Sequence, residues 1–245
     1  MIEEEKSNIF IQRLKILENR ILSTCSKTNV KRENIKILAV SKKKTSKDIE
    51  VAISQGLFSF GENYLSEALE KIDRLSVRKN FSTLLDWHFI GQIQRNKTKK
   101  IAENFDWVHS IEKFEIAQRL SNQRPVYLKP LNVFIQVNID QEESKGGTSI
   151  EDAKSLVIKI SKLPQISVKG LMAIPKSTND FAKQKCSFAK LKQTKDEINK
   201  SSKLDVKLGH LSMGMSNDLE AAISETDKFT KTWIRIGTSI FGERK

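Results

Sequence analysis

The sequence predicts an α/β fold, a single (β/α)8 barrel of the TIM type with one extra N-terminal helix. Eight short apolar segments alternate with segments of helical periodicity along 245 residues, which is the order and size that such a barrel needs. No G-x-G-x-x-G turn follows the first apolar segment, so a doubly wound open sheet ranks second. Since no linker rich in Pro, Gly or Ser interrupts the alternation, we expect residues 1–245 to form one domain.

The first element is a helix from Ile2 to about Cys25, because apolar residues recur there at helical spacing between charged ones. We expect residues 1–30 to pack on the barrel. The predicted strands are Ile35–Val40, Phe58–Phe60, Trp87–Ile90, Trp107–Ser110, Asn132–Asn138, Ile166–Met172, Val206–Leu211 and Trp233–Ile236. The predicted helices between them are Ser46–Gln55 with Ser46 as the N-cap, Tyr64–Leu75, Asn96–Glu103, Lys113–Ser121, a helix opened by Ser149, Asp180–Lys200 and Asp218–Ser224.

Composition excludes several classes of protein. The chain carries 43 Lys+Arg against 30 Asp+Glu, a formal charge of +13, and its 38% hydrophobic residues suffice for a buried core. No apolar run approaches the roughly 18 residues that a membrane span needs, and the acidic start does not resemble a signal peptide, so we expect a cytoplasmic protein. Cys25 and Cys186 form no C-x-x-C pattern and are expected to be free thiols.

Two other features indicate neither a metal nor a nucleic-acid partner. His88, His109 and His210 show no H-x-H or H-E-x-x-H spacing, which favours structural roles and no metal. The basic run Arg95–Lys100 lacks interleaved aromatic residues and falls at a helix start, which is typical of a solvated face. The other lysines are spread along the whole chain.

Lys42, directly after the first predicted strand, is the leading candidate for a functional side chain. Functional groups of a (β/α)8 barrel gather at the carboxyl ends of the strands. A lysine held there against apolar walls has its charged form disfavoured, and a neutral amine forms a Schiff base with an aldehyde. The alternative is a surface lysine, because Lys43 and Lys44 follow.

The loops after the last two strands contain the second candidate. Gly237 and Thr238, completed by Ser212 and Gly214, have the backbone freedom and hydroxyl groups that a phosphate cradle uses, although simple turns would show the same residues. Arg235 shares the side-chain face of Gly237, and inside a barrel it would need a partner.

Several motifs in one order resemble a known family from about residue 35 to the C-terminus. They are Ile37–Lys42, Phe60–Tyr64, Trp87–Gly91, Gln136–Asn138 with Glu143–Lys145, Gly170–Met172, Leu211–Ser216, Arg235–Thr238 and Ile240–Gly242. Together they closely resemble the pyridoxal phosphate homeostasis protein family. Gln92, Arg95 and the pair Gly146-Gly147 depart from the family pattern at loop positions and leave the cofactor motifs intact.

The resemblance implies one barrel similar to the N-terminal domain of alanine racemase, with pyridoxal 5′-phosphate at its mouth. It assigns a Schiff base to Lys42, the phosphate to Ser212, Gly237 and Thr238, the pyridine nitrogen to Arg235, and the surroundings of the ring to Asn63 and Met172. Because an arginine donates and does not accept a proton, a pyridine nitrogen facing it stays unprotonated and the ring becomes a weaker electron sink.

Two functions follow from the resemblance. The first is a protein that holds pyridoxal phosphate and takes part in its intracellular homeostasis, with apoenzymes as partners and without efficient catalysis. The second is an amino-acid racemase, which needs an acid or base on each face of the substrate carbon. Lys42 serves one face, and the racemase that the chain resembles takes its second base from a β-domain that we expect to be missing after Lys245, so the first function and a monomer are favoured. A third hypothesis, an RNA-binding barrel, explains the charge but none of the motifs.

Overall fold

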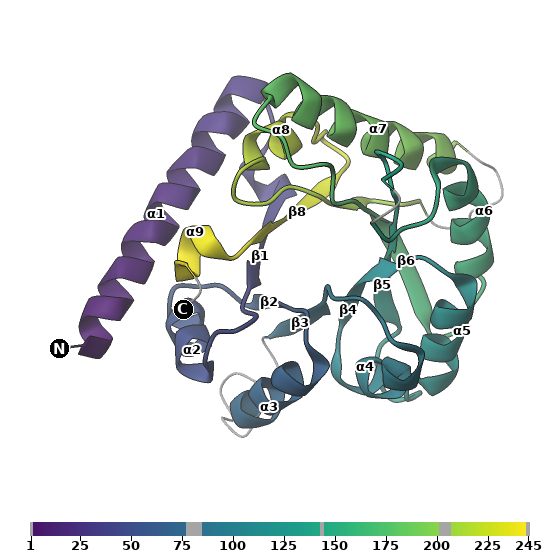
Figure 1. Cartoon of the computed structure of the whole chain (residues 1–245), viewed down its shortest axis with the longest axis horizontal. Helices are drawn as coiled ribbons and strands as arrows, with labels where there is room; N and C mark the ends of the chain where they lie inside the picture. The colour runs from purple at the N-terminus through teal and green to yellow at the C-terminus, as the bar shows by residue number, and fades with distance from the viewer. Residues whose placement is uncertain (1, 77–84, 143–144, 201–206, 244–245) are drawn as a thin grey trace.

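The structure, a computed structural model, describes residues 2–76, 85–142, 145–200 and 207–243. Strands within these ranges are parallel and close into an eight-stranded barrel in sequence order, with the first strand paired to the last (Figure 1). They are β1 (Ile35–Val40), β2 (Ser59–Glu62), β3 (Asp86–Phe89), β4 (Trp107–Ile111), β5 (Leu131–Gln136), β6 (Ile166–Met172), β7 (His210–Ser212) and β8 (Lys231–Ile236). The predicted (β/α)8 barrel is confirmed.

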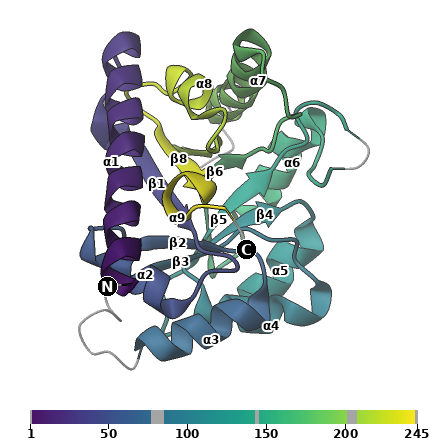
Figure 2. The same cartoon turned by 60° about the vertical axis from the view of Figure 1, so that its left-hand side comes forward.

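Helices surround the barrel (Figures 1 and 2). They are α1 (Ile2–Thr28), α2 (Ser46–Ser54), α3 (Leu65–Ser76), α4 (Thr98–Asn104), α5 (Phe114–Gln123), α6 (Ile150–Ile160), α7 (Phe181–Asn199), α8 (Leu219–Ser224) and α9 (Thr238–Phe241), with 3₁₀ turns η1 (Arg32–Asn34) and η2 (Arg95–Lys97). The extra helix α1 lies against α8 and α9 and buries Phe10, Leu17 and Ile21 (Figure 2). Among the described helices, none is long and apolar enough to cross a membrane.

Several element ends differ from the prediction for local reasons. Thr45, and not Ser46, caps α2: its side chain accepts from the Asp48 amide while the Asp48 carboxylate accepts from the Thr45 amide, a reciprocal box that the sequence analysis missed. Ser149 caps α6 as predicted. The predicted strand from Val206 starts later, at His210, and Val206 lies outside the described residues.

The barrel interior is filled by a cluster separate from the main core between barrel and helices. Its members are Leu38, Trp107, Phe134, Met172 and Trp233. Because these side chains close the inside of the sheet, the space for a ligand lies at the carboxyl ends of the strands, where the barrel opens into loops.

Candidate functional site

A cavity of about 580 Å³ lies at the carboxyl ends of the strands. It is lined by Val40 from the end of β1, Ile90 just after β3, and loop residues that include Asn217. Among the seven site residues expected from the sequence, six line it: Lys42, Asn63, Met172, Arg235, Gly237 and Thr238. The fold therefore brings residues from four separate motifs to one space.

Ser212, the seventh, lies beneath this cavity and does not line it. Its side chain is fully buried, and its Oγ accepts a hydrogen bond from Arg235 Nη1 at 2.8 Å and lies 2.8 Å from Nδ1 of His109. These contacts occupy the hydroxyl, so Ser212 supports Arg235 here. On this side the cavity is lined by the loop residues Met215, Ser216 and Asn217. Met215 and Ser216 fall within the motif Leu211–Ser216 but were given no role, and Asn217 was missed.

Arg235 is a buried cation at the floor of the cavity. Besides Ser212, its guanidinium donates through Nη2 to the carbonyl oxygen of Ala173 at 2.9 Å. Burial lowers the pKa of Arg235 to about 10, with the nearby charge of Asp218 opposing the shift. The group therefore keeps its proton at neutral pH and presents a fixed positive charge.

Two glutamates anchor the residues on both sides of Lys42. Ser41 donates through Oγ to Glu62 Oε1 at 2.6 Å, and the Lys43 amide donates to Glu67 Oε1 at 2.5 Å. Lys43 itself has a φ of 61°, a left-handed conformation that costs a non-glycine residue free energy. The turn after β1 is thus held in one shape, with Lys42 on the wall of the cavity.

Lys71, from α3, joins these groups into one buried network. Its ammonium donates to the Ser41 carbonyl oxygen at 2.7 Å, to Glu62 Oε1 at 2.7 Å and to Glu67 Oε1 at 2.6 Å. Burial raises the pKa of Glu62, and the positive charge of Lys71 opposes that shift. All three N–H donors of Lys71 are used on these partners, so the network holds the turn that contains Lys42 against α3.

Two of the three histidines, His88 and His109, form a hydrogen-bonded chain inside the barrel. His88 Nδ1 lies 2.9 Å from His109 Nε2, and His109 continues to Ser212 and Arg235. Burial lowers the pKa of both histidines well below the usual value, so both are neutral at pH 7. Across the described part of the chain, no group of three His, Cys, Asp or Glu side chains is placed to hold a metal ion.

The charge of the cavity favours an anionic ligand. Lys42, Lys145, Lys176 and Arg235 line it against one carboxylate, Asp218. The Asp218 carboxylate accepts from the Met215 amide at 2.5 Å, and burial raises its pKa. Cations that line a cleft attract anionic groups, of which phosphate is one.

The residues present fit pyridoxal phosphate. Lys42 supplies an amine for an aldehyde, Gly237 allows the backbone to approach a phosphate, and Thr238 adds a hydroxyl. Asn63 contributes Oδ1, a buried acceptor without a hydrogen-bond partner among the described residues, which a ligand donor would satisfy.

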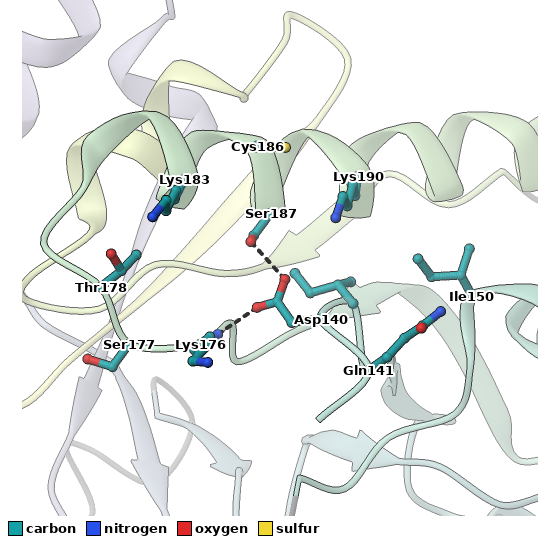
Figure 3. A pocket seen from close by; sticks show the side chains of 11 residues that line it. Asp140, Gln141, Ile150, Lys176, Ser177, Thr178, Lys183, Cys186, Ser187 and Lys190 are labelled. Carbon is teal, nitrogen blue, oxygen red and sulfur yellow. Dashed lines mark hydrogen bonds between the residues drawn. The ribbon is translucent and has the colours of Figure 1, made fainter. Parts of the chain in front are cut away.

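A second cavity of about 630 Å³ lies between α7 and the loops after β5 and β6 (Figure 3). Asp140 joins its walls by accepting from the Lys176 amide at 2.6 Å and from Ser187 Oγ at 2.9 Å. It is slightly larger than the first cavity but contains neither Lys42 nor Arg235. Its chemistry therefore does not match the predicted site.

Comparison with known proteins gives concordant findings. Residues 20–245 match the family model of the alanine racemase N-terminal domain. The chain is 49% identical over 208 residues to the pyridoxal phosphate homeostasis protein of Pseudomonas aeruginosa, covering 85% of this chain and 84% of that protein. It is 40% identical over 231 residues to the homologue of the same name from Haemophilus influenzae, covering 94% of each.

Solved structures extend the likeness. PipY of Synechococcus elongatus with pyridoxal phosphate bound superposes with a TM-score of 0.77 and 29% identity, covering 95% of this chain and all of that one (100%). Alanine racemase of Corynebacterium glutamicum gives a TM-score of 0.67 at 13% identity, covering 97% of this chain and 62% of the racemase. The racemase shares the fold.

Proposed function

Because the chain belongs to the pyridoxal phosphate homeostasis protein family, we propose that it binds pyridoxal 5′-phosphate in the cavity of about 580 Å³ and holds it as a Schiff base on Lys42. The observation that carries the proposal is that Lys42 shares this cavity with Arg235, Gly237 and Thr238. The cofactor bound to PipY supports it.

Six of the lining residues hold the cofactor in this proposal, and the cofactor supplies a reactive aldehyde and an electron-accepting ring. The Lys42 amine binds the aldehyde, Gly237 and Thr238 take the phosphate, and Arg235 donates to the ring nitrogen. Asn63 and Met172 contact the ring. The sequence analysis assigned Ser212 to the phosphate. Its side chain contacts Arg235 in the structure, and we propose that it also positions this guanidinium.

We further propose that the protein works in intracellular cofactor homeostasis without efficient catalysis. An arginine that keeps its proton leaves the ring nitrogen unprotonated, and this weakens carbanion stabilisation. The curated relatives are named homeostasis proteins and not enzymes. The alternative, an amino-acid racemase, draws on the shared fold alone, and 62% of the Corynebacterium glutamicum racemase is covered.

The visible absorption spectrum before and after borohydride reduction, with peptide mass mapping, tests the binding mode. We expect a yellow band in the wild type, its absence in Lys42→Ala, and a reduced adduct on Lys42. Lys43→Ala is the matched control, because Lys43 is the exposed neighbour. A wild type that stays colourless after addition of pyridoxal phosphate would refute the proposal.

The proposed recipients are apoenzymes that depend on this cofactor, reached by a cytoplasmic monomer. Adding the yellow protein to an apo-aminotransferase tests the transfer. We expect aminotransferase activity to rise as the yellow band falls, and sedimentation at several concentrations to give the mass of one chain. If activity rises no faster than the cofactor dissociates from the protein into buffer alone, direct transfer to the apoenzyme is contradicted.

A further inference from the structure

A smaller cavity of about 320 Å³ adjoins the cavity of about 580 Å³, hereafter the cofactor cavity. The two share Asn63, Ile90 and Ile174 in their linings, so the smaller one opens beside the wall that contains Lys42. The rest of its lining combines polar side chains with apolar ones: Gln92, Ser110, Glu112 and Gln136 with Ile93 and Ile116. Its size and mixed lining suit a small organic molecule.

Glu112, the residue after β4, is the charged side chain in the lining of this cavity within the described ranges. Its neighbour, the cofactor cavity, is lined mainly by cations. The Glu112 carboxylate accepts from the Gly147 amide through Oε2 at 2.8 Å. The cavity therefore presents a negative charge, held in place by the loop that carries Gly146 and Gly147.

Two glycines maintain the walls of this cavity. A Cβ at Gly146 would lie 2.7 Å from Glu112 Oε2, and a Cβ at Gly91 would lie 2.2 Å from the Asn63 carbonyl oxygen. Ser110 donates to the Gly91 carbonyl oxygen at 2.5 Å and fixes that wall. Because neither Gly91 nor Gly146 carries a side chain, no side chain at these positions covers the Glu112 carboxylate.

The acceptors of this cavity call for a ligand that donates. The carboxylate of Glu112 accepts, and Asn63 adds the acceptor Oδ1 at the wall that this cavity shares with the cofactor cavity. Carboxylates form their strongest hydrogen bonds with cationic N–H donors, and they repel anions.

We propose that this cavity is a subsite for the primary ammonium group of a small amino compound. The inference rests on the proposed function, since an amine held by Glu112 would lie in a cavity that adjoins the one proposed to hold the cofactor. The subsite would admit amines next to the cofactor and disfavour anions there.

Glu112 has one competing role, that of a clamp for the loop at Gly147. The substitution Glu112→Gln separates the two roles. Glutamine keeps an oxygen that accepts the Gly147 amide, but it has no charge for an ammonium group. A pure clamp therefore tolerates the change, whereas an ammonium site does not.

Ligand-observed NMR titration with propylammonium chloride tests the proposal, with sodium propionate as the anionic probe. Both the protein as purified and Lys42→Ala, which lacks the proposed attachment point, are titrated. We expect propylammonium to bind both proteins, propionate to bind neither, and Glu112→Gln to weaken the binding by about tenfold. Glu115→Gln, an exposed glutamate one turn away on α5, is expected to stay within about twofold of wild type.

Equal propylammonium binding by wild type and Glu112→Gln would overturn the subsite, as would binding of propionate with similar affinity. This outcome is separate from failure of the proposed function. A colourless wild type that still binds propylammonium through Glu112 would refute the cofactor site and leave the ammonium site standing.

Discussion

Arg235 donates to Ser212 across the β7–β8 pair at 2.8 Å, and this bond places the guanidinium at the floor of the cofactor cavity. Both side chains are buried, so neither exchanges its partner for water. The Ser212 hydroxyl thus holds the guanidinium of Arg235, the group that we propose faces the pyridine ring. The geometry of the proposed site therefore depends on a buried residue that does not line the cavity.

Replacing Ser212 by alanine is the first prediction. The change removes one partner of a buried charged group, which costs about 1–3 kcal/mol of the free energy of unfolding. It also leaves Arg235 with the Ala173 carbonyl oxygen as its remaining hydrogen-bond partner, so we expect the guanidinium to shift and the absorption band of bound cofactor to shift or broaden. Urea unfolding and visible spectra check both effects. In Ser216→Ala, a cavity-side control, stability should remain at the wild-type value, and a stable Ser212→Ala with an unaltered band would contradict the positioning role.

Much of this site followed from the sequence because strand ends follow from the alternation of apolar and helical segments. Once Ile35–Val40 and Trp233–Ile236 are strands, Lys42 and Gly237 must lie at the same end of the barrel. Strand order therefore predicted that Lys42 and Gly237 share the cavity, whereas polar lining residues of the later loops, such as Lys176 and Asn217, were not predicted.

The hydrogen-bond networks that hold the site in place could not be predicted from the sequence, because they depend on strand register and on partners distant in sequence. Glu67 and Lys71 have the spacing of an ordinary surface pair on a helix, and only the packing of α3 on β2 brings Glu62 to the same ammonium. The contact between His88 and His109 likewise requires the pairing of β3 with β4.

The second prediction concerns the network under Lys42. Lys71→Met leaves the fully buried Glu62 without its cation, and we expect a loss of about 3–5 kcal/mol in the free energy of unfolding. Adding Glu62→Gln to that variant should recover part of the loss, since the uncompensated charge disappears. Guanidinium unfolding gives both values. Lys100→Met, at an exposed position, serves as the control, and a double variant no more stable than Lys71→Met would refute the coupling.

A third prediction follows from the buried histidines. Burial holds the pKa of His88 and His109 well below the ordinary histidine value of about 6.5 and lowers that of His210 to about 4. Each depressed pKa contributes stability that is present above the unfolded-state pKa and is lost as the pH falls. Below pH 6.5, the free energy of unfolding should therefore fall by up to about 1.4 kcal/mol per pH unit for each histidine.

Urea unfolding at pH 7.5, 6.5 and 5.5 measures this slope. In His210→Gln one of the three titrating groups is gone, so its stability should fall less steeply between pH 6.5 and 5.5 than that of the wild type. Carboxyl groups with raised pKa, such as Glu62 and Asp218, change stability with the opposite sign, and they are present in both proteins, so the difference between the two slopes reports His210. Equal slopes for the two proteins would show that His210 is protonated in the folded state.

The last prediction places an alanine at Gly91, where the loop after β3 passes the turn after β2. The new Cβ would lie 2.2 Å from the Asn63 carbonyl oxygen, a backbone atom that cannot rotate away, so the turn must move. Since Asn63 lines the cofactor cavity, we expect weaker binding of pyridoxal phosphate and a loss of about 1–3 kcal/mol in stability. Gly209→Ala is the control, because its Cβ would meet no atom within 4 Å. Fluorescence titration with the cofactor and thermal unfolding measure the two effects, and a Gly91→Ala protein with wild-type affinity would show that the position of Asn63 does not limit binding.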